Sequence, residues 1–267
     1  MSRVRHNSAE VQLQREWTAA GIGGGMILIA AGAVLASGLG VSPGLIWLLA
    51  SGTVLVLQLL VVRRHLHLNH RSDGRLLPSL GTANRITLFR GLLIAGLAGF
   101  VFLPRSTANV ENWRWVPAAI FILASLLDLL DGWTARKTAT ETELGRKLDT
   151  EFDALTILAG GVLALRWEKA SLWFILVGLA YYLFRLGCRL RKQRGLPSAP
   201  LRPSRIRRPL AGTAMGLTGA VLLPVMSAEL GRSLTLIFTI PFLGNFIYDY
   251  LTVSRRIGNV KAPESEP

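Results

Sequence analysis

The sequence predicts an all-α fold, namely a polytopic integral membrane protein with about eight transmembrane helices. Hydrophobic residues make up 51% of the 267 residues, and long apolar runs recur along the chain. A run of about twenty apolar residues crosses the hydrocarbon core of a bilayer as one helix. Basic residues gather between these runs rather than within them. A soluble domain of this length would not contain so many apolar runs, which leaves a membrane protein.

The predicted spans form an N-terminal pair and a group of six. Residues 1–80 hold a basic segment and two spans, near 18–37 and 43–62, that contain no charged residue and are interpreted as an accessory hairpin. Residues 81–256 hold six spans, near 87–104, 115–130, 150–166, 172–187, 209–226 and 234–252. Proline and arginine at 195–209 interrupt the helical pattern within this group. The tail at 257–267 is expected to be disordered.

The distribution of basic residues predicts the orientation of the chain. With eight spans and a cytoplasmic N-terminus, 25 of the 30 Lys and Arg residues fall on the cytoplasmic side. Lys and Arg are retained on that side during insertion, so we expect both termini in the cytoplasm and the protein in a bacterial inner membrane. The net charge of +14 then reflects loops that face anionic lipid head groups of the bilayer, and no nucleic-acid partner is expected.

Four carboxylates lie at the ends of two neighbouring spans. Asp128 and Asp131 are three residues apart, and Asp149 and Asp153 are four apart, so each pair shares one helix face. The loop predicted at 136–148 is short enough to bring the two faces together. Four negative charges in one small volume need compensation. Hard cations bind carboxylate oxygens, so we expect two divalent cations, Mg²⁺ or Mn²⁺, at the cytoplasmic interface.

The residues between these carboxylates suit a phosphate ligand. Gly132 and Ala135 have almost no side chain, so a nucleotide could approach the backbone there. Arg136 offers a planar set of donors to phosphate oxygens, and Gly145 would relieve crowding opposite them. Such a site fits the transfer of a phosphoryl-type group, in which a carboxylate takes the proton of the attacking hydroxyl.

The spacing D-x2-D-G-x2-A-R-x8-G-x3-D-x3-D resembles the signature of the CDP-alcohol phosphotransferase family, also called CDP-alcohol phosphatidyltransferases, at all eight defined positions. The resemblance implies a core of six transmembrane helices, covering roughly residues 82–253, and a homodimer. It also implies an enzyme that moves a substituted phosphate from a CDP-linked donor to an alcohol and releases CMP.

The resemblance also implies roles for individual residues. Three aspartates would ligate metal, and Asp153 would both touch metal and act as the general base. Two further groups would line the CDP site, one from the motif and one from ANRITLFR, which is similar to the opening of the family's first core helix although Ala83 stands where proline is common. The metal ligands are Asp128, Asp131 and Asp149; the CDP-site residues are Gly132, Ala135, Arg136, Gly145, Asn84, Thr87 and Arg90.

The acceptor side of the site is less specified by the sequence. Nine basic residues lie between 185 and 208. They either only set the topology or bind a phosphorylated alcohol or the diphosphate of a lipid donor, and Arg185, Arg189 and Arg205 are the candidates for that binding. The function we expect is phosphatidyl transfer from CDP-diacylglycerol to a polar alcohol in phospholipid synthesis. A CDP-choline or CDP-ethanolamine transferase acting on diacylglycerol is the alternative within the family. An ion- or proton-coupled transporter is the rival class, because intramembrane aspartates also serve transport.

Overall fold

The computed structural model describes residues 2–70, 76–111, 113–138, 141–196, 199, 201 and 204–254. Side chains are described for these residues except 2–8, 108, 109, 135, 136 and 138. The described residues form helices and connecting loops without a β-strand, which confirms the predicted all-α class. The tail predicted at 257–267 lies outside them.

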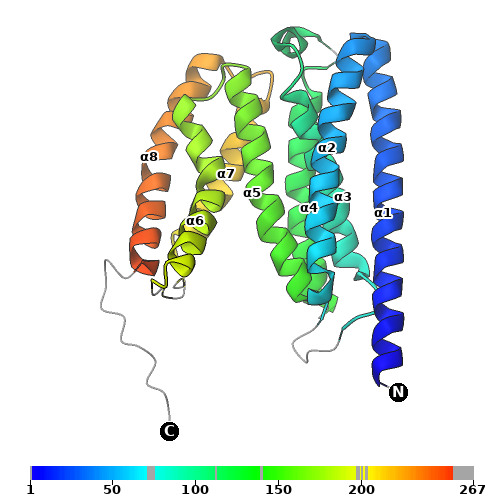
Figure 1. Cartoon of the computed structure of the whole chain (residues 1–267). Coiled ribbons are helices and arrows are strands. Elements are labelled where there is room, and N and C mark those ends of the chain that lie inside the picture. The colour runs from blue at the N-terminus through cyan, green and yellow to red at the C-terminus, as the bar shows by residue number, and fades with distance from the viewer. Residues whose placement is uncertain are drawn as a thin grey trace.

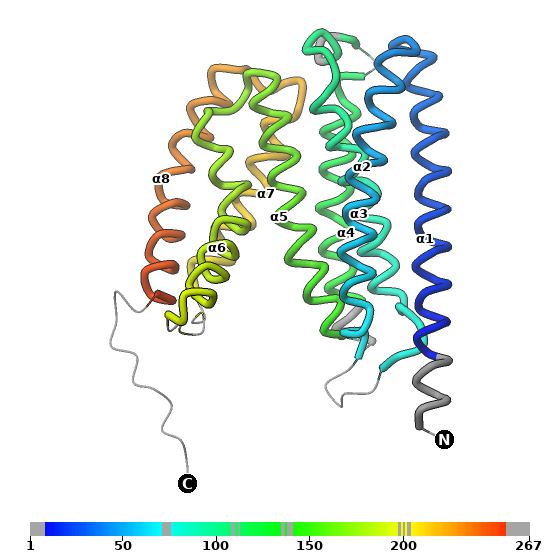
Figure 2. The backbone as a smooth tube through the Cα atoms, in the orientation of Figure 1, coloured from blue at the N-terminus to red at the C-terminus, as the bar shows by residue number. Residues whose placement is uncertain are grey.

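The described residues form eight α-helices, with short 3-10 turns at Leu66–Leu68, Arg105–Asn109 and Leu172–Phe174. In Figure 1, α1 to α4 stand together on one side of the molecule and α5 to α8 on the other. The tube in Figure 2 shows that α1 begins and α8 ends at the same end of the bundle. The helices are α1 (Ser2–Leu39), α2 (Val41–His65), α3 (Gly81–Phe100), α4 (Val116–Thr138), α5 (Glu143–Arg166), α6 (Ile175–Gln193), α7 (Arg207–Leu222) and α8 (Ala228–Val253).

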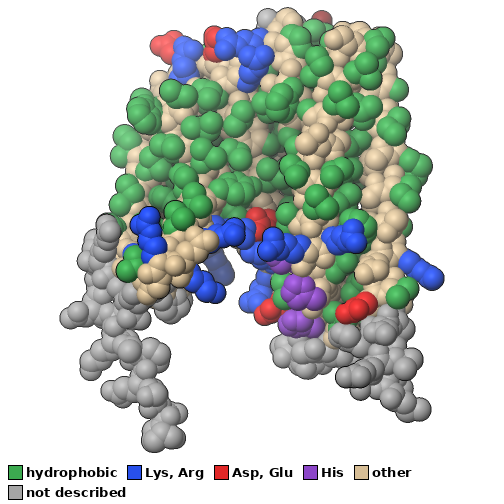
Figure 3. Space-filling view, viewed as in Figure 1, with side chains coloured by type: hydrophobic (Ala, Val, Ile, Leu, Met, Phe, Trp, Pro, Cys, Tyr) green, Lys and Arg blue, Asp and Glu red, His purple; other side chains and the backbone are tan. Residues whose placement is uncertain are grey.

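Five helical segments in the described part of the chain are long and apolar enough to cross a membrane: Ala9–Leu39, Val41–Leu68, Val116–Thr134, Leu172–Gln193 and Ala228–Val253. The other three predicted spans fall in α3, α5 and α7, which do not meet that standard, so the count of eight is not confirmed. Charged and polar residues lower the hydropathy of α3 and α5, and α7 has only 16 residues. Figure 3 shows a broad hydrophobic face between two ends that both carry Lys and Arg, which are gathered most densely at the end where α1 begins.

Helix α3 lies at the centre of the first helix group and joins the hairpin to the rest of the bundle. It packs against α2, α4 and α5. Trp47 of α2 donates a hydrogen bond from Nε1 to the carbonyl of Gly96 at 2.9 Å. Close approach of the two helices requires glycine at position 99, because a Cβ there would lie 2.2 Å from Ser51 Oγ. The hairpin is therefore fixed to the helix that carries Asn84, Thr87 and Arg90.

Candidate functional site

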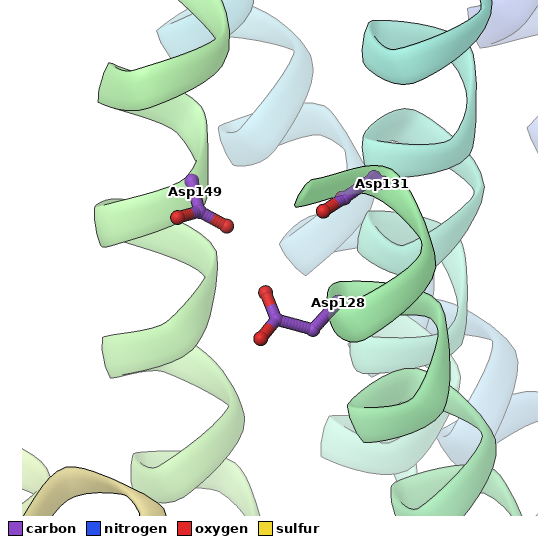
Figure 4. A group of neighbouring side chains, drawn as sticks. All are labelled: Asp128, Asp131 and Asp149. Carbon is purple, nitrogen blue, oxygen red and sulfur yellow. The ribbon is translucent and has the colours of Figure 1, made fainter. Parts of the chain in front are cut away.

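The carboxylates of the motif meet across a space between two helices. Asp128 and Asp131 project from α4 towards Asp149 on α5, as Figure 4 shows. Carboxylate oxygens of these three residues lie within 4.8 Å of one another. The spacing of the motif thus produces one cluster, formed by the C-terminal half of α4 and the first turns of α5.

The connection between α4 and α5 is shorter than the predicted loop 136–148, which was wrong at both ends. Helix α4 continues to Thr138, and α5 begins at Glu143 because Thr142 caps it. The Thr142 hydroxyl accepts a hydrogen bond from the Gly145 amide at 3.0 Å, as an N-cap residue does. The two helices touch little, and α3 packs against both, so α3 sets the distance between the two carboxylate pairs.

Arg90 of α3 lies in the middle of the carboxylate cluster. Its Nη1 forms a close ion pair with Asp128 and lies 3.9 Å from Asp131 and 3.3 Å from Asp153, while Nη2 lies 3.1 Å from Asp149. Only 2% of its side chain is exposed. The four carboxylates and this guanidinium leave a formal charge of −3 in the cluster. One arginine therefore offsets only part of the negative charge that the motif brings together.

The two other residues predicted on α3 support the cluster from one side. Thr87 Oγ1 donates a hydrogen bond to Asp131 Oδ2 at 2.9 Å. Asn84 is buried, and its Nδ2 donates to Asn69 Oδ1 at 3.2 Å and to Thr142 Oγ1 at 3.3 Å. Asn84 thus links the first turn of α3 to the cap of α5. The sequence did not indicate Asn69 or Thr142, because only the fold brings these three segments together.

Glycine is required at position 145 because Asn84 and Thr142 meet beside it. A Cβ at position 145 would lie 2.8 Å from Asn84 Oδ1 and 3.3 Å from Thr142 Oγ1. Gly132 is partly exposed on α4, beside Asp131. Ala135 and Arg136 belong to α4, but their side chains lie outside the described residues, so the structure does not place them relative to the cluster.

The cluster fits a divalent cation. Opposite ligands of Mg²⁺ are about 4.2 Å apart, twice a bond of about 2.1 Å, so oxygens within 4.8 Å need only a small movement to share an ion. The donor set consists of carboxylate oxygens, which hard cations prefer. Asp153 adds a fourth carboxylate: its Oδ1 is buried and accepts no hydrogen bond from the described residues, while 38% of the side chain is exposed. A second ion could therefore be held between Asp149 and Asp153.

A second polar group lies on the far side of α5. Arg185 forms a close ion pair with Glu151, which also lies 3.5 Å from Lys147 Nζ. Arg207 binds Asp249 through two hydrogen bonds of 3.0 and 3.1 Å. Residues of these pairs line a cavity of about 500 Å³ between α5, α6, α7 and α8.

Of the three arginines predicted for an acceptor phosphate, only Arg185 is among the residues that line this cavity. Arg189 and Arg205 are exposed and are not among the lining residues. Lys147, Arg207 and Asp249 were missed by the sequence reasoning, although Asp249 is an acid within the predicted span 234–252, and that signal could have indicated it.

The fold and the site define a class: a helical membrane protein with a carboxylate cluster arranged around a buried arginine at one end of the bundle. The family profile of CDP-alcohol phosphatidyltransferase matches residues 80–242, which is more than half of the sequence. The chain belongs to this family, which confirms the resemblance carried by the motif. Helices α1 and α2 lie outside the matched residues.

Curated relatives give a consistent result. The chain is 30% identical over 116 residues to a CDP-diacylglycerol–glycerol-3-phosphate 3-phosphatidyltransferase of Bacillus subtilis, covering 43% of this chain and 60% of the relative. Proteins with the same name from Wigglesworthia glossinidia brevipalpis and Pseudomonas fluorescens are 33% and 34% identical over 94 residues, covering 35% of this chain and 48% and 45% of the relatives. The chain thus spans about half the length of these relatives. No solved structure matches the chain significantly.

Proposed function

We propose that the protein transfers a phosphatidyl group from CDP-diacylglycerol to an alcohol and releases CMP. The observation that carries the proposal is the cluster of Asp128, Asp131 and Asp149 around Arg90, built by a motif that the family shares. The names of the curated relatives support CDP-diacylglycerol as the donor.

The proposed reaction is a displacement at phosphorus. The acceptor hydroxyl oxygen attacks the phosphorus that carries diacylglycerol, the bond from this phosphorus to the bridging oxygen of the diphosphate breaks, and CMP leaves with that oxygen. Asp153 takes the hydroxyl proton, because its partly exposed carboxyl lies one helical turn beyond Asp149 on α5. Gly132 and Gly145, together with Ala135 and Arg136, form the proposed CDP site.

Asp128, Asp131, Asp149 and Asp153 would hold two divalent cations, Mg²⁺ or Mn²⁺, which supply charge stabilisation for the diphosphate when bound. Thr87 and Arg90 position the carboxylates on the α3 side, through the hydrogen bond to Asp131 and the ion pairs described above. Asn84 acts one step further away, by holding the cap of α5. We assign these three residues to positioning the cluster rather than to contact with the base of the nucleotide.

We propose a phosphorylated alcohol as the acceptor. The cavity behind α5 is lined by Lys147, Arg185 and Arg207, and these cations exceed the neighbouring carboxylates of Glu151 and Asp249 by one charge. Lys147 lies within two turns of Asp153 on α5. A phosphate bound by Lys147 would lie about 9 Å along the axis of α5 from the proposed base, a distance that an alcohol joined to that phosphate must reach around the helix. The relatives' names, which include glycerol 3-phosphate, point to the same class of acceptor.

We further propose that the site faces the cytoplasm of a bacterial cell and that the protein is a homodimer in the inner membrane. The orientation is supported by the excess of basic residues in the loops at the end that carries the cluster (Figure 3). Both termini then lie on the cytoplasmic side, since α1 begins and α8 ends there (Figure 2). The dimer is supported by the family resemblance.

The decisive experiment uses the purified full chain in lipid nanodiscs with CDP-diacylglycerol, Mg²⁺ or Mn²⁺, and separate acceptors: glycerol 3-phosphate, inositol 1-phosphate, glycerol and serine. We expect CMP release only with a phosphorylated acceptor, together with a new phospholipid that carries the acceptor's own phosphate and is identified by its mass. Asp153→Asn should still bind the donor but lose about 10²- to 10⁴-fold in turnover, the contribution of a general base. Absence of CMP with every acceptor and metal would refute the transferase, and equal rates with glycerol would refute the phosphorylated acceptor.

A further inference from the structure

The hairpin and the core helix α3 enclose a second cavity, away from the carboxylate cluster. It has a volume of about 250 Å³ and is lined mainly by apolar groups of α1, α2 and α3, among them Gly23, Ile27, Leu59 and Phe89. Ile27 and Phe89 are also exposed on the outer surface. The cavity is thus an apolar groove on the membrane-facing side of the helices that lie largely outside the family match.

One polar side chain lies in the wall of this groove. Gln58 belongs to the candidate span Val41–Leu68 and is 5% exposed. Both its Nε2 and its Oε1 are buried, and neither has a hydrogen-bond partner among the described residues. A buried amide in a membrane helix is unfavourable unless it is hydrogen-bonded. An amide of this kind in an apolar groove points to a ligand that is apolar except for one hydrogen-bonding group.

Basic side chains surround the cytoplasmic end of the groove. Arg85 of α3 lines the cavity, and its Nη2 lies 3.2 Å from Glu16 Oε1 on α1. The guanidinium of Arg63 on α2 stacks over Trp17, the residue next to Glu16, at 5.3 Å from the ring centroid. Arg64 is exposed beside it. At this level three arginines from two helices stand against two glutamates, Glu16 beside Arg85 and Glu10 in a pocket that Arg63 also lines. The cations therefore exceed the acids by one charge, which favours an anionic group.

The distance between Arg85 and Gln58 along the groove matches the distance between the head group and the ester groups of a single lipid. Gln58 lies beside Gly91, since a Cβ there would be 3.3 Å from Gln58 Oε1. Arg85 and Gly91 are six positions apart on α3, which is about 9 Å along the helix axis. The polar layer of each leaflet is about 5–8 Å deep, half the difference between the whole bilayer and its hydrocarbon core. With Arg85 among the head groups, Gln58 lies where the ester groups of a glycerolipid enter the hydrocarbon core.

We propose that this groove binds an anionic glycerophospholipid of the surrounding bilayer. One acyl chain lies between α1 and α3 against Gly23, its ester carbonyl accepts a hydrogen bond from Gln58 Nε2, and its phosphate lies beside Arg85. Phe152 of α5 is among the residues that line the groove, but none of the four carboxylates of the cluster is, so we assign the groove a ligand distinct from the substrates of that cluster. The proposal therefore does not depend on the transferase activity.

The test uses the full chain in nanodiscs that contain a trace of phospholipid with a photoactivatable diazirine in one acyl chain, followed by mapping of labelled peptides by mass spectrometry. Three probes are compared: ester-linked phosphatidylglycerol, its ether-linked analogue and ester-linked phosphatidylcholine. Gly23→Leu places a side chain in the groove, whereas Gly25→Leu is the matched control on the same helix. Both positions have open space around a new Cβ, but only Gly23 lines the cavity.

With ester-linked phosphatidylglycerol we expect labelling concentrated on peptides that contain Ile27 and Phe89. The ether analogue should label about three- to tenfold less, the effect of one hydrogen bond to a buried group. Gln58→Leu should remove this ester–ether difference, and Gly23→Leu but not Gly25→Leu should remove the labelling.

Labelling spread evenly over all helices, or equal labelling by the ester and ether probes in the wild type, would overturn the proposal. Phosphatidylcholine that labels as strongly as phosphatidylglycerol would overturn the assignment to an anionic lipid. The wild-type comparison of the probes remains decisive even if Gln58→Leu does not fold.

Discussion

Replacement of Arg90 by methionine tests the electrostatics of the candidate site most directly. Methionine keeps a long side chain but removes the charge that lies 3.1 Å from Asp149 and 3.3 Å from Asp153 and also pairs with Asp128. Four carboxylates would then share the site without an internal cation. Loss of one partner from a buried ion pair costs about 3–5 kcal/mol. That is a large part of a folding free energy of about 5–15 kcal/mol.

Arg85→Met is the matched control on the same helix. The side chain of Arg85 is 65% exposed and, among the residues that the structure describes, forms an ion pair with Glu16 alone, so its loss should cost less than about 1 kcal/mol. The assay is thermal unfolding of detergent-solubilised protein in EDTA and in Mg²⁺. In EDTA we expect Arg90→Met to lower Tm by about 6–20 °C, since 1 kcal/mol corresponds to about 2–4 °C in a chain of this size.

Added Mg²⁺ should raise the Tm of Arg90→Met more than that of the wild type, because the cation would neutralise carboxylates that have lost their guanidinium. A ligand at one hundred times its Kd stabilises the folded state by about 2.7 kcal/mol. Equal Tm values for Arg90→Met and Arg85→Met in EDTA would refute the placement of Arg90 in a charged cluster. No rise of Tm with Mg²⁺ in either protein would refute the metal site, and equal rises would refute the influence of Arg90 on it.

Three further predictions follow from the same geometry. Asp149→Asn should abolish CMP release at any Mg²⁺ concentration, whereas Glu168→Gln, at an exposed acid just beyond the far end of α5, should leave it unchanged; equal activity of the two variants would contradict the metal-ligand role. Gly145→Ala should cost about 1–3 kcal/mol in unfolding free energy because its Cβ would lie 2.8 Å from a buried amide oxygen. Gly212→Ala, with open space around it in α7, should be neutral or slightly stabilising, and similar Tm values for both alanine variants would argue against the packing described. Thr142→Ala should cost about 1 kcal/mol through loss of the α5 cap, and an unchanged Tm would show that the cap contributes nothing.

Much of the helical fold could be predicted from local sequence. Each predicted span overlaps one helix, because apolar residues in long runs form helices whatever lies around them. The ends of the helices were predicted less well than their existence. Helix α4 continues through Arg136 to Thr138, and α5 begins at Glu143, where Thr142 caps it. The basic composition of residues 136–148 had predicted a longer loop, because composition does not reveal where a cap begins a helix. The number of spans was not confirmed, since α3 and α5 carry charged site residues and α7 has only 16 residues.

The sequence by itself determined which carboxylates pair on each helix and to which family the chain belongs. A spacing of three or four residues places two side chains on one helix face, and this depends only on the pitch of the helix. The tertiary structure decided that Arg90 lies among these carboxylates, that Asn84 holds the cap of α5, and that Gln58 faces an apolar groove. Those contacts join residues many positions apart, and packing around α3 sets their distances, so no spacing along the chain could fix them.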